Sequence, residues 1–194
     1  DCVLFSRQPS LHKFNIQSGI IKIWNNNTIG ISTAVTNSFN GDFDGDEMNI
    51  QKLLINDFEA MIKMSASSIF KNNYNMSPIF GLIQDQLIAI HTLYKMKNIS
   101  RNNAIMLLGK YSYFIKDIDK QNYTGAEVLS LIFPDNLSYD NIFKNGNLII
   151  DSINSEHLVF QSYDTLINIV SQYSNDVLAI SVLDALIHIS INFL

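Results

Sequence analysis

The most informative segment of the sequence, residues 39–49, reads Phe39-Asn40-Gly41-Asp42-Phe43-Asp44-Gly45-Asp46-Glu47-Met48-Asn49. Its three aspartates alternate by two residues, so in an extended strand their side chains share one face. Gly45 allows the backbone to bend, which makes the three carboxylates converge. Converging carboxylates repel one another, and a divalent cation relieves that repulsion. Because hard oxygen ligands favour Mg²⁺, Ca²⁺ or Mn²⁺ over zinc, the segment indicates a site for one of these ions.

Two other interpretations use the same residues. A solvated acidic turn is one of them, since Asp and Gly are ordinary turn residues, and for an isolated motif it stays open. The other is an EF-hand calcium loop, which needs Gly at its sixth position and Glu at its twelfth. Counted from Asp42, these positions hold Glu47 and Leu53, so the calcium loop is excluded.

Composition narrows the class of protein. The chain has 194 residues, 47% of them apolar, which suits one domain or two small ones with a sizeable core. Its net charge of −5 argues against a protein that simply coats nucleic acid. The single cysteine, Cys2, excludes a disulfide scaffold and a Cys-rich zinc site and fits a reducing compartment. Residues 177–194 are the most membrane-like stretch, but Asp184 and His188 interrupt them, which favours a buried helix.

Two regions follow one another along the chain. Residues 1–50 are rich in β-branched residues, with strand-like runs over residues 20–24 and 29–35. From about residue 54 the apolar pattern becomes mostly helical. Helix start signals lie at Asn56 with Glu59, at Ser77-Pro78, at Ser100 and at Thr124 with Glu127, and further helices are expected from about Tyr163 and from Asn175. Asn145-Gly146 predicts a hairpin turn.

Residues 39–49 closely resemble the catalytic signature of the largest subunit of multisubunit DNA-directed RNA polymerases. Upstream, at about the usual distance, residues 3–13 resemble the family's second signature; they read Val3-Leu4-Phe5-Ser6-Arg7-Gln8-Pro9-Ser10-Leu11-His12-Lys13. Residues 77–85 resemble the segment that opens the helix of the family's pore domain. Residues 124–134, 146–150 and 183–194 are similar in outline. The resemblance therefore covers essentially the whole chain, strongly over residues 1–50 and more loosely after residue 95.

The resemblance implies an α+β fold. Residues 1–62 would form the end of the active-site double-psi β-barrel. Residues 63–194 would form a mostly α-helical pore domain with a small β-hairpin. Because the chain begins at Asp1 without an initiating Met, we expect an internal fragment of a longer chain. Gly41 stands where the family usually has Ala, and residues 50–54 replace a His-Val-Pro-like stretch, which suggests a divergent lineage. The ending Asp46-Glu47-Met48-Asn49 resembles eukaryotic, archaeal or viral members of the family rather than bacterial ones.

The resemblance also implies a metal site. Asp42, Asp44 and Asp46 match the three catalytic carboxylates that hold a permanent Mg²⁺, which would bind the RNA 3′-hydroxyl and orient its attack on the α-phosphate. A second Mg²⁺, arriving with the nucleoside triphosphate, would stabilise the departing pyrophosphate.

Four further residues match substrate-binding positions of the family. Arg7 corresponds to the arginine near the sugar of the incoming nucleotide, and Asn40 to the asparagine that helps to distinguish ribose from deoxyribose. Both side chains present directed hydrogen bonds suited to hydroxyl groups. Gln8 and Pro9 would lie beside the nascent base pair.

The implied parent is a DNA-directed RNA polymerase that transfers nucleotides from ribonucleoside triphosphates to the RNA 3′-end in transcription. Its expected partners are the second-largest polymerase subunit, other polymerase subunits, the DNA template and the RNA product, with no membrane. The fragment alone is expected to be inactive. The expected location is intracellular: the nucleus if cellular, the host cytoplasm or virion if from a large DNA virus. A catalytically inactive relative and an RNA-templated relative of the same double-barrel fold stay open as alternatives.

The remaining polar candidates favour structural interpretations. His12 lies in the second signature, where a hydrogen bond within the fold is as plausible as a role near the site. Gln84 is expected to fix its helix against the barrel. His91 and His188 lie on apolar helical stretches and are expected at the core or its boundary, and His157 has no identifiable partner.

Overall fold

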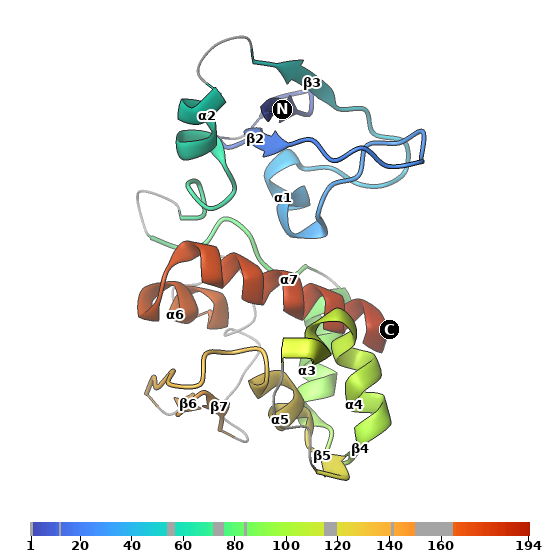
Figure 1. Ribbon diagram of the computed structural model, residues 1–194, viewed down its shortest axis with the longest axis vertical. Coiled ribbons are helices and arrows are strands. Elements are labelled where there is room, and N and C mark those ends of the chain that lie inside the picture. Colours follow the sequence, from blue (N-terminus) through green and yellow to red (C-terminus); the bar gives the residue numbers. More distant parts are fainter. Residues whose placement is uncertain are drawn as a thin grey trace. The chain divides into compact units, whose positions relative to one another are not determined.

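The computed structural model describes residues 2–11, 13–53, 57–71, 76–83, 85–114, 120–140, 142–149 and 165–194. The chain forms two compact units: unit 1 is Asp1–Phe80 and unit 2 is Gly81–Leu194. Figure 1 shows short strands and helices in unit 1 and a mostly helical unit 2. This mixed content confirms the α+β prediction in outline. The assignment of residues 1–62 to a double-psi β-barrel and of residues 63–194 to a pore domain stays a prediction.

Unit 1 is built on a three-stranded antiparallel sheet with β1 at its centre. The strands are β1 (Cys2–Ser6), β2 (Ile16–Ile20) and β3 (Asn49–Lys52), and the helical segments are η1 (Thr33–Val35, a 3-10 helix), α1 (Thr36–Phe39) and α2 (Asp57–Met64). Helix α2 lies against β1 and β2, where the Ser18 hydroxyl donates a 2.9 Å hydrogen bond to the Ala60 carbonyl. In the register of the sheet, Ser6 pairs with both Ile16 and Asn49, so the last residue of β1 and the first residue of β3 lie side by side at one end of the sheet.

The strand-like run predicted over residues 29–35 is wrong, and the run over residues 20–24 holds only at Ile20. The chain is irregular after β2 and then enters η1 and α1. Ser32 caps η1, because its hydroxyl accepts a 3.3 Å hydrogen bond from the Ala34 N–H. Hydroxyl side chains of this kind give the backbone a local alternative to the strand ladder.

The helix start predicted at Ser77-Pro78 is also wrong, since the helix begins at Asp85. Pro78 instead forms an antiparallel bridge with Lys71, and the Ile79 N–H donates a 2.8 Å hydrogen bond to the Phe70 carbonyl. This pairing buries the Phe70 and Phe80 rings against each other, with centroids 6.3 Å apart. Tertiary packing of two aromatic rings therefore overrides the local start signal.

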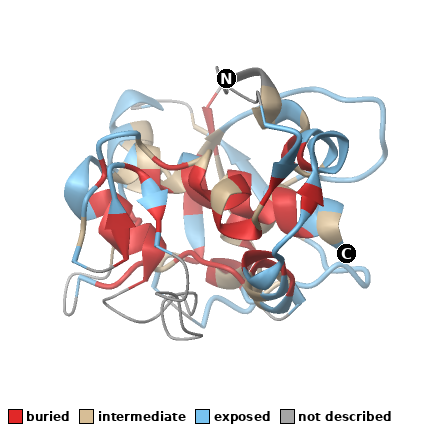
Figure 2. Cartoon of the chain, turned by 90° about the horizontal axis from the view of Figure 1, so that it is seen from below, coloured by how far each residue is buried: buried red, intermediate tan, exposed pale blue. Residues whose placement is uncertain are grey.

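The described part of unit 2 is mostly helical. Its helical segments are α3 (Asp85–Lys95), α4 (Arg101–Leu108), η2 (Gly109–Phe114, a 3-10 helix), α5 (Gly125–Ser130), α6 (Leu166–Tyr173) and α7 (Asp176–Phe193). The longest helix, α7, contacts α3, α4, α6 and the 3-10 helix η2, and α5 packs against α3. Figure 2 shows buried residues, in red, running along these helices. At the contact between α3 and α5 the backbones approach so closely that a Cβ on Gly125 would lie 1.6 Å from the Leu93 carbonyl oxygen.

The described residues of unit 2 also form two short antiparallel strand pairs. Strand β4 (Ile99–Ser100) pairs with β5 (Asn122–Tyr123), and β6 (Phe143–Lys144) pairs with β7 (Asn147–Leu148). The turn between β6 and β7 is Asn145-Gly146, and both residues have positive φ angles, 50° and 76°. The predicted hairpin turn is therefore confirmed, because two consecutive residues with φ above zero are what a tight type I′ turn requires.

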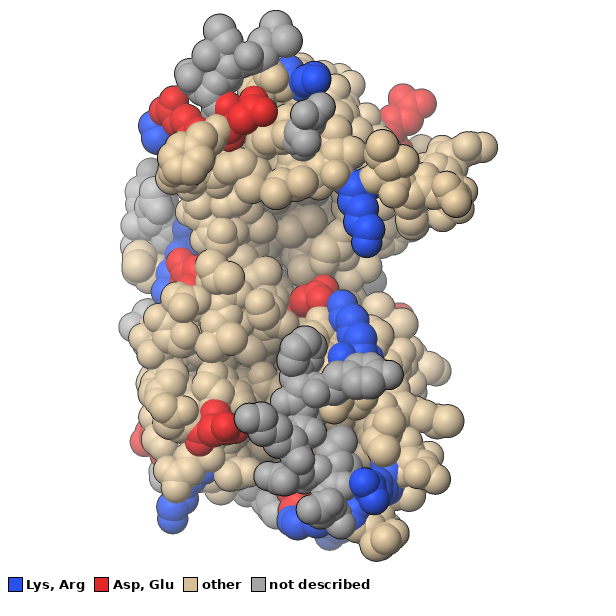
Figure 3. Space-filling model, in the orientation of Figure 1, with Lys and Arg blue, Asp and Glu red and all other residues tan. Residues whose placement is uncertain are grey.

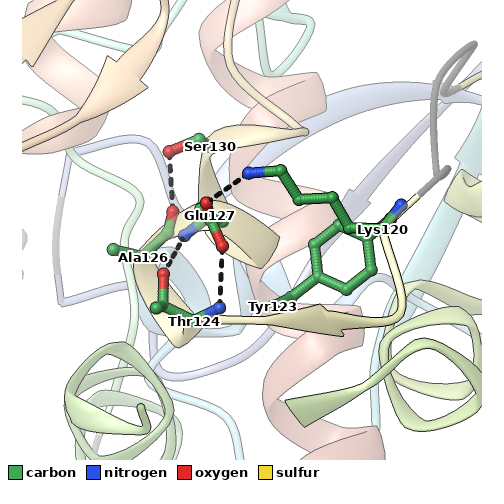
Figure 4. Close-up of polar contacts among 6 residues, drawn as sticks. All are labelled: Lys120, Tyr123, Thr124, Ala126, Glu127 and Ser130. Carbon is green, nitrogen blue, oxygen red and sulfur yellow. Dashed lines mark hydrogen bonds and ion pairs between the residues drawn. The ribbon is translucent and has the colours of Figure 1, made fainter. Parts of the chain in front are cut away.

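Polar side chains cap the helices of unit 2. Ser100, Thr124, Thr165 and Asn175 each accept a hydrogen bond from the backbone N–H three residues further on. Thr124 and Glu127 form the complete capping box that the sequence predicts, drawn in Figure 4 together with the ion pair from Lys120 to Glu127. The predicted cap at Ser100 and the predicted helix start at Asn175 are confirmed as well. The signals at Asn56 and Tyr163 lie outside the described residues.

Helix α7 is long and apolar enough to cross a membrane by length and composition alone, and no other helix of the described residues meets that test. In unit 2 it buries Val182, Leu183, Leu186 and Ile189. The expectation of a buried helix is met on that face. Val177, near the start of the same helix, is exposed.

Candidate metal-binding site

The loop between α1 and β3 carries the three predicted metal ligands. Asn40 ends α1 in the left-handed conformation (φ 48°, ψ 41°), and its N–H donates to the carbonyls of Thr36 and Asn37. Asn adopts this conformation more readily than most residues, so it turns the chain out of the helix. The loop then reaches Asn49, which pairs with Ser6. This register brings the loop to the end of β1, directly beside Arg7.

The three aspartates converge as the sequence predicts. One carboxylate oxygen from each of Asp42, Asp44 and Asp46 lies within 4.8 Å of the other two, and all three residues are exposed. Gly45, between the last two, has a φ of 126°, which L-residues rarely adopt. The donor set consists of carboxylate oxygens, which is the set that Mg²⁺, Ca²⁺ and Mn²⁺ prefer. The residues present therefore fit a hard divalent cation.

Arg7 binds Asp46 through two nitrogens. The Arg7 Nε lies 2.6 Å from Asp46 Oδ2, and the Nη2 group donates a 2.9 Å hydrogen bond to Oδ1. The Asp42 N–H donates a 3.0 Å hydrogen bond to the same Oδ2, and Arg7 Nη1 donates to the Phe39 carbonyl at 3.5 Å. Hydrogen bonding between the two side chains raises the pKa of Arg7 and, with the backbone bond from Asp42, lowers the pKa of Asp46. Asp46 is therefore both fixed and ionised.

The pKa of Asp42 shifts in the opposite direction from that of Asp46. Hydrogen bonding with Asp44 raises the pKa of Asp42 above its ordinary value, and burial and the negative charges of Asp44 and Asp46 add to the rise. Neighbouring carboxylates repel one another, and a bound cation relieves that repulsion. The electrostatics of the loop thus favour a bound cation.

A cavity of about 810 Å³ adjoins the loop. Arg7, Asp42 and Asp46 contribute to one wall, and the segment from Trp24 to Ile31 contributes to another. The Trp24 indole N–H donates a 2.8 Å hydrogen bond to the Thr28 carbonyl, which closes that segment into a turn. Sequence reasoning did not connect this segment to the aspartate loop. Its composition, with three asparagines between two strand-like runs, gave no signal that it would line the same cavity as the loop.

The four predicted substrate-binding residues differ in how they lie relative to the aspartate loop and the cavity. Arg7 contacts the aspartate loop directly, as described above. Asn40 begins that loop with an exposed side chain. Gln8 and Pro9 follow Arg7, are exposed, and do not contribute to the lining of the cavity. Their roles toward a substrate stay predictions.

The other candidates of the sequence have structural surroundings. His91 and His188 are half-buried, as expected for boundary positions. The His188 ring packs edge-on against Tyr111, with centroids 5.6 Å apart. His12, Gln84 and His157 lie outside the described residues. Among the described residues on the face in Figure 3, acidic and basic side chains are interspersed and the basic ones form no continuous patch.

Comparison with known families assigns both parts of the chain. The family model described as RNA polymerase Rpb1, domain 2, matches residues 1–64, and RNA polymerase Rpb1, domain 3, matches residues 69–194. The chain therefore belongs to the Rpb1 family, that of the RNA polymerase largest subunit. The resemblance drawn from the sequence is confirmed at the level of the family.

Individual relatives agree with this assignment. The DNA-directed RNA polymerase 147 kDa polypeptide of fowlpox virus (strain NVSL) is 30% identical over 180 residues, which are 90% of this chain and 14% of the relative. The polypeptide of the same name from vaccinia virus (strain Ankara) is 28% identical over 177 residues, with the same coverage. DNA-directed RNA polymerase subunit Rpo1N of Methanothermobacter thermautotrophicus is 29% identical over 141 residues, 71% of this chain and 16% of the relative. The chain thus spans about one seventh of the length of these relatives.

Proposed function

We propose that the chain is the catalytic-centre segment of a DNA-directed RNA polymerase. In the parent enzyme it provides the carboxylates for template-directed transfer of nucleotides from ribonucleoside triphosphates to the RNA 3′-end. One observation carries the proposal: in a member of the Rpb1 family, oxygens of Asp42, Asp44 and Asp46 lie within 4.8 Å of one another. The implied partners are the second-largest subunit, other polymerase subunits, the DNA template and the RNA product.

The residues of the loop and the segments around it have different roles in this proposal. Asp42, Asp44 and Asp46 would hold the cation through their carboxylate oxygens. A Mg²⁺ ion held there would supply Lewis-acid activation of the attacking hydroxyl and, with a second ion carried by the triphosphate, charge neutralisation of the leaving pyrophosphate. Arg7 and Asn40 hold the sugar of the incoming nucleotide through directed hydrogen bonds. Residues 63–194 contribute the pore region through which nucleotides enter.

The test is primer extension by the purified parent enzyme in Mg²⁺, comparing the wild type with Asp44→Asn. The substitution removes one ligand charge at an exposed position, so we expect subunit assembly and template binding to persist. Extension should fall by at least about a hundredfold, because a catalytic cation stabilises the transition state by several kcal/mol. Glu47→Gln is the matched control, since Glu47 is exposed in the same loop but outside the cluster.

The outcomes separate the alternatives. Normal extension by Asp44→Asn would mean that the chemistry lies elsewhere and would favour a catalytically inactive module. Extension on RNA templates in preference to DNA templates, with Asp44→Asn inactive, would favour the RNA-templated relative. Loss of assembly in Asp44→Asn but not in Glu47→Gln would point to a structural role for the loop.

A further inference from the structure

A buried amide joins β2 to the helix from which the aspartate loop starts. Gln17, in β2, is 1% exposed, and Ser38, in α1, is 4% exposed. The Gln17 Nε2 group donates a 2.5 Å hydrogen bond to Ser38 Oγ and a 3.1 Å hydrogen bond to the Phe14 carbonyl. The Ser38 hydroxyl in turn donates a 2.6 Å hydrogen bond to the Val35 carbonyl. These bonds link two segments of unit 1 that lie side by side (Figure 1).

We propose that Gln17 is a positioning residue for the metal site. Its amide holds α1 against β2 and thereby fixes the start of the aspartate loop. Gln17 lies outside both signature segments, residues 3–13 and 39–49, and acts through Ser38 rather than on the cation or the substrate. The inference rests on the proposed function and assigns the spacing of the three carboxylates to a contact outside their own loop.

Helix α1 needs such a contact because it is too short to be stable by itself. It has four residues, and a single helical turn offers few hydrogen bonds against the cost of ordering its backbone. Two contacts hold it on the sheet: the Phe39 ring packs against Phe5, with centroids 5.2 Å apart, and Ser38 accepts from Gln17. Apolar packing supplies attraction without direction, whereas a hydrogen bond depends on angle as well as distance. The bond from Gln17 therefore fixes the rotation of α1.

The rotation of α1 decides where the aspartate loop starts. The Gly41 N–H donates a 3.3 Å hydrogen bond to the Thr36 carbonyl, which ties the first residue of the loop to the helix, and Asp42 follows directly. The other end of the loop is fixed independently, by the pairing of Asn49 with Ser6. Because only one end is attached to α1, a shift of α1 changes the spacing of the carboxylates instead of moving all three together.

The surroundings require an amide at position 17. The Phe14 carbonyl can only accept a hydrogen bond, and the Ser38 hydroxyl already donates to Val35, so both contacts need a donor. The amide nitrogen has the two hydrogens required. Methionine or leucine offers none, and glutamate offers one only when it is protonated. The side chain of Gln17 is therefore matched to its two acceptors.

This amide is retained at a cost to stability. Gln17 Oε1 and both polar side-chain atoms of Asn15 are buried, with no hydrogen-bond partner among the residues that the structure describes. Leaving a buried polar atom unpaired is unfavourable, and an apolar side chain of similar shape would avoid that cost. Packing alone thus does not account for a glutamine here, whereas the directed bond to Ser38 does.

The experiment measures Mn²⁺ binding to the assembled parent enzyme by electron paramagnetic resonance, without nucleotides. Gln17→Met removes both hydrogen bonds of the amide, and Ser38→Ala removes only the bond to α1. Each should raise the Kd for Mn²⁺ about threefold to tenfold, the range that one or two hydrogen bonds supply. Ser18→Ala is the matched control: it removes a buried hydroxyl from the same strand that bonds to Ala60 in α2, and it should leave the Kd unchanged.

Two further readouts separate positioning from a general loss of folding. The double variant should bind Mn²⁺ no more weakly than Gln17→Met alone, because the two residues share one hydrogen bond. In primer extension, raising the Mg²⁺ concentration should restore much of the rate lost by Gln17→Met and Ser38→Ala, because mass action refills a weakened site. A misfolded fraction of the enzyme would not respond to Mg²⁺.

The outcomes distinguish this inference from the proposed function. An unchanged Mn²⁺ affinity in Ser38→Ala would overturn the link through α1, and so would additive effects of the two substitutions or equal weakening by Ser18→Ala. If Asp44→Asn abolishes Mn²⁺ binding in the same assay, the metal site stands whatever Gln17 does. If Asp44→Asn binds Mn²⁺ like the wild type, the proposed function fails. Should Gln17→Met not assemble, Ser38→Ala, which removes a single hydroxyl, decides the question.

Discussion

Unit 1 and unit 2 bury their apolar side chains to different extents. In unit 1, α2 contains no buried residue, Phe58 on that helix is 79% exposed, and β3 is exposed along its whole length. In unit 2, α5 and α6 bury most of their residues, and Leu129 and Val170 are fully buried. The unit that holds the aspartate loop therefore leaves more of its apolar side chains exposed than the helical unit does.

The largest expected difference between the two units should appear when each is produced as a separate fragment. A fragment of residues 81–194 should unfold in one cooperative transition, because apolar burial is the main favourable term in folding. A fragment of residues 1–80 should show no cooperative transition. Thermal unfolding followed by circular dichroism measures both, with residues 1–194 as the reference. A transition of residues 1–80 as sharp as that of residues 81–194 would contradict the comparison.

The two units should also respond to acid in opposite directions. Burial alone would raise the pKa of Asp184, but hydrogen bonds from Tyr111 and Lys110 outweigh it and hold the pKa below its ordinary value. A lowered pKa in the folded state contributes stability above the unfolded-state pKa of about 4, and that stability is lost as the pH falls through the folded-state pKa. For Asp42 the pKa is raised, so acid relieves repulsion in unit 1.

Asp184→Asn tests the acid response of unit 2. At pH 7 it should cost about 1 kcal/mol, a modest value because the Asp184 side chain is 40% exposed and solvent screens its charge. Below pH 5 the difference from the wild type should shrink. Urea unfolding of residues 81–194 at several pH values measures this, with the exposed Asp135→Asn as the control. A difference that stays constant from pH 7 to pH 3 would rule out ionised Asp184 as the cause.

Local signals in the sequence predicted much of unit 2. The caps at Ser100 and Thr124, the helix start at Asn175 and the Asn145-Gly146 turn need only residues within a few positions of one another, so the sequence is sufficient to identify them. The start signal at Ser77-Pro78 failed for the opposite reason. There, packing of two phenylalanine rings around a bridge decides the path of the chain.

Some features of the candidate site likewise follow from the local sequence, and others depend on contacts between distant segments. Convergence of the three aspartates follows from their spacing and from Gly45, which are local features. The contact between Arg7 and Asp46 depends on the pairing of Ser6 with Asn49 across the sheet, and no local pattern encodes that register. The wall that includes Trp24 was missed because its β-branched composition also suits a strand.

The smallest expected effect concerns Gly41, where the sequence resemblance implies an Ala in related chains. A Cβ there would lie 3.5 Å from Arg7 Cδ, 3.7 Å from Asp46 Oδ2 and 3.9 Å from Phe39 Cβ, which are ordinary contact distances. Gly41→Ala should therefore fit, and should stabilise the parent enzyme by about 0.4–1 kcal/mol, because it restricts the unfolded chain. The Kd for Mn²⁺ should change by less than about twofold, since no ligand moves.

Gly45→Ala is the matched control for this substitution. Nothing lies within 4 Å of a Cβ on Gly45, but its φ of 126° is strained for any L side chain. Its cost should come from the backbone alone, about 1 kcal/mol or more, with weaker Mn²⁺ binding as the loop shifts. Thermal unfolding and Mn²⁺ titration of the two variants compare space with backbone conformation at two glycines of one loop. Equal destabilisation by both would mean that the Gly41 backbone is also strained, and that the chain has reshaped the loop rather than merely lost a methyl group.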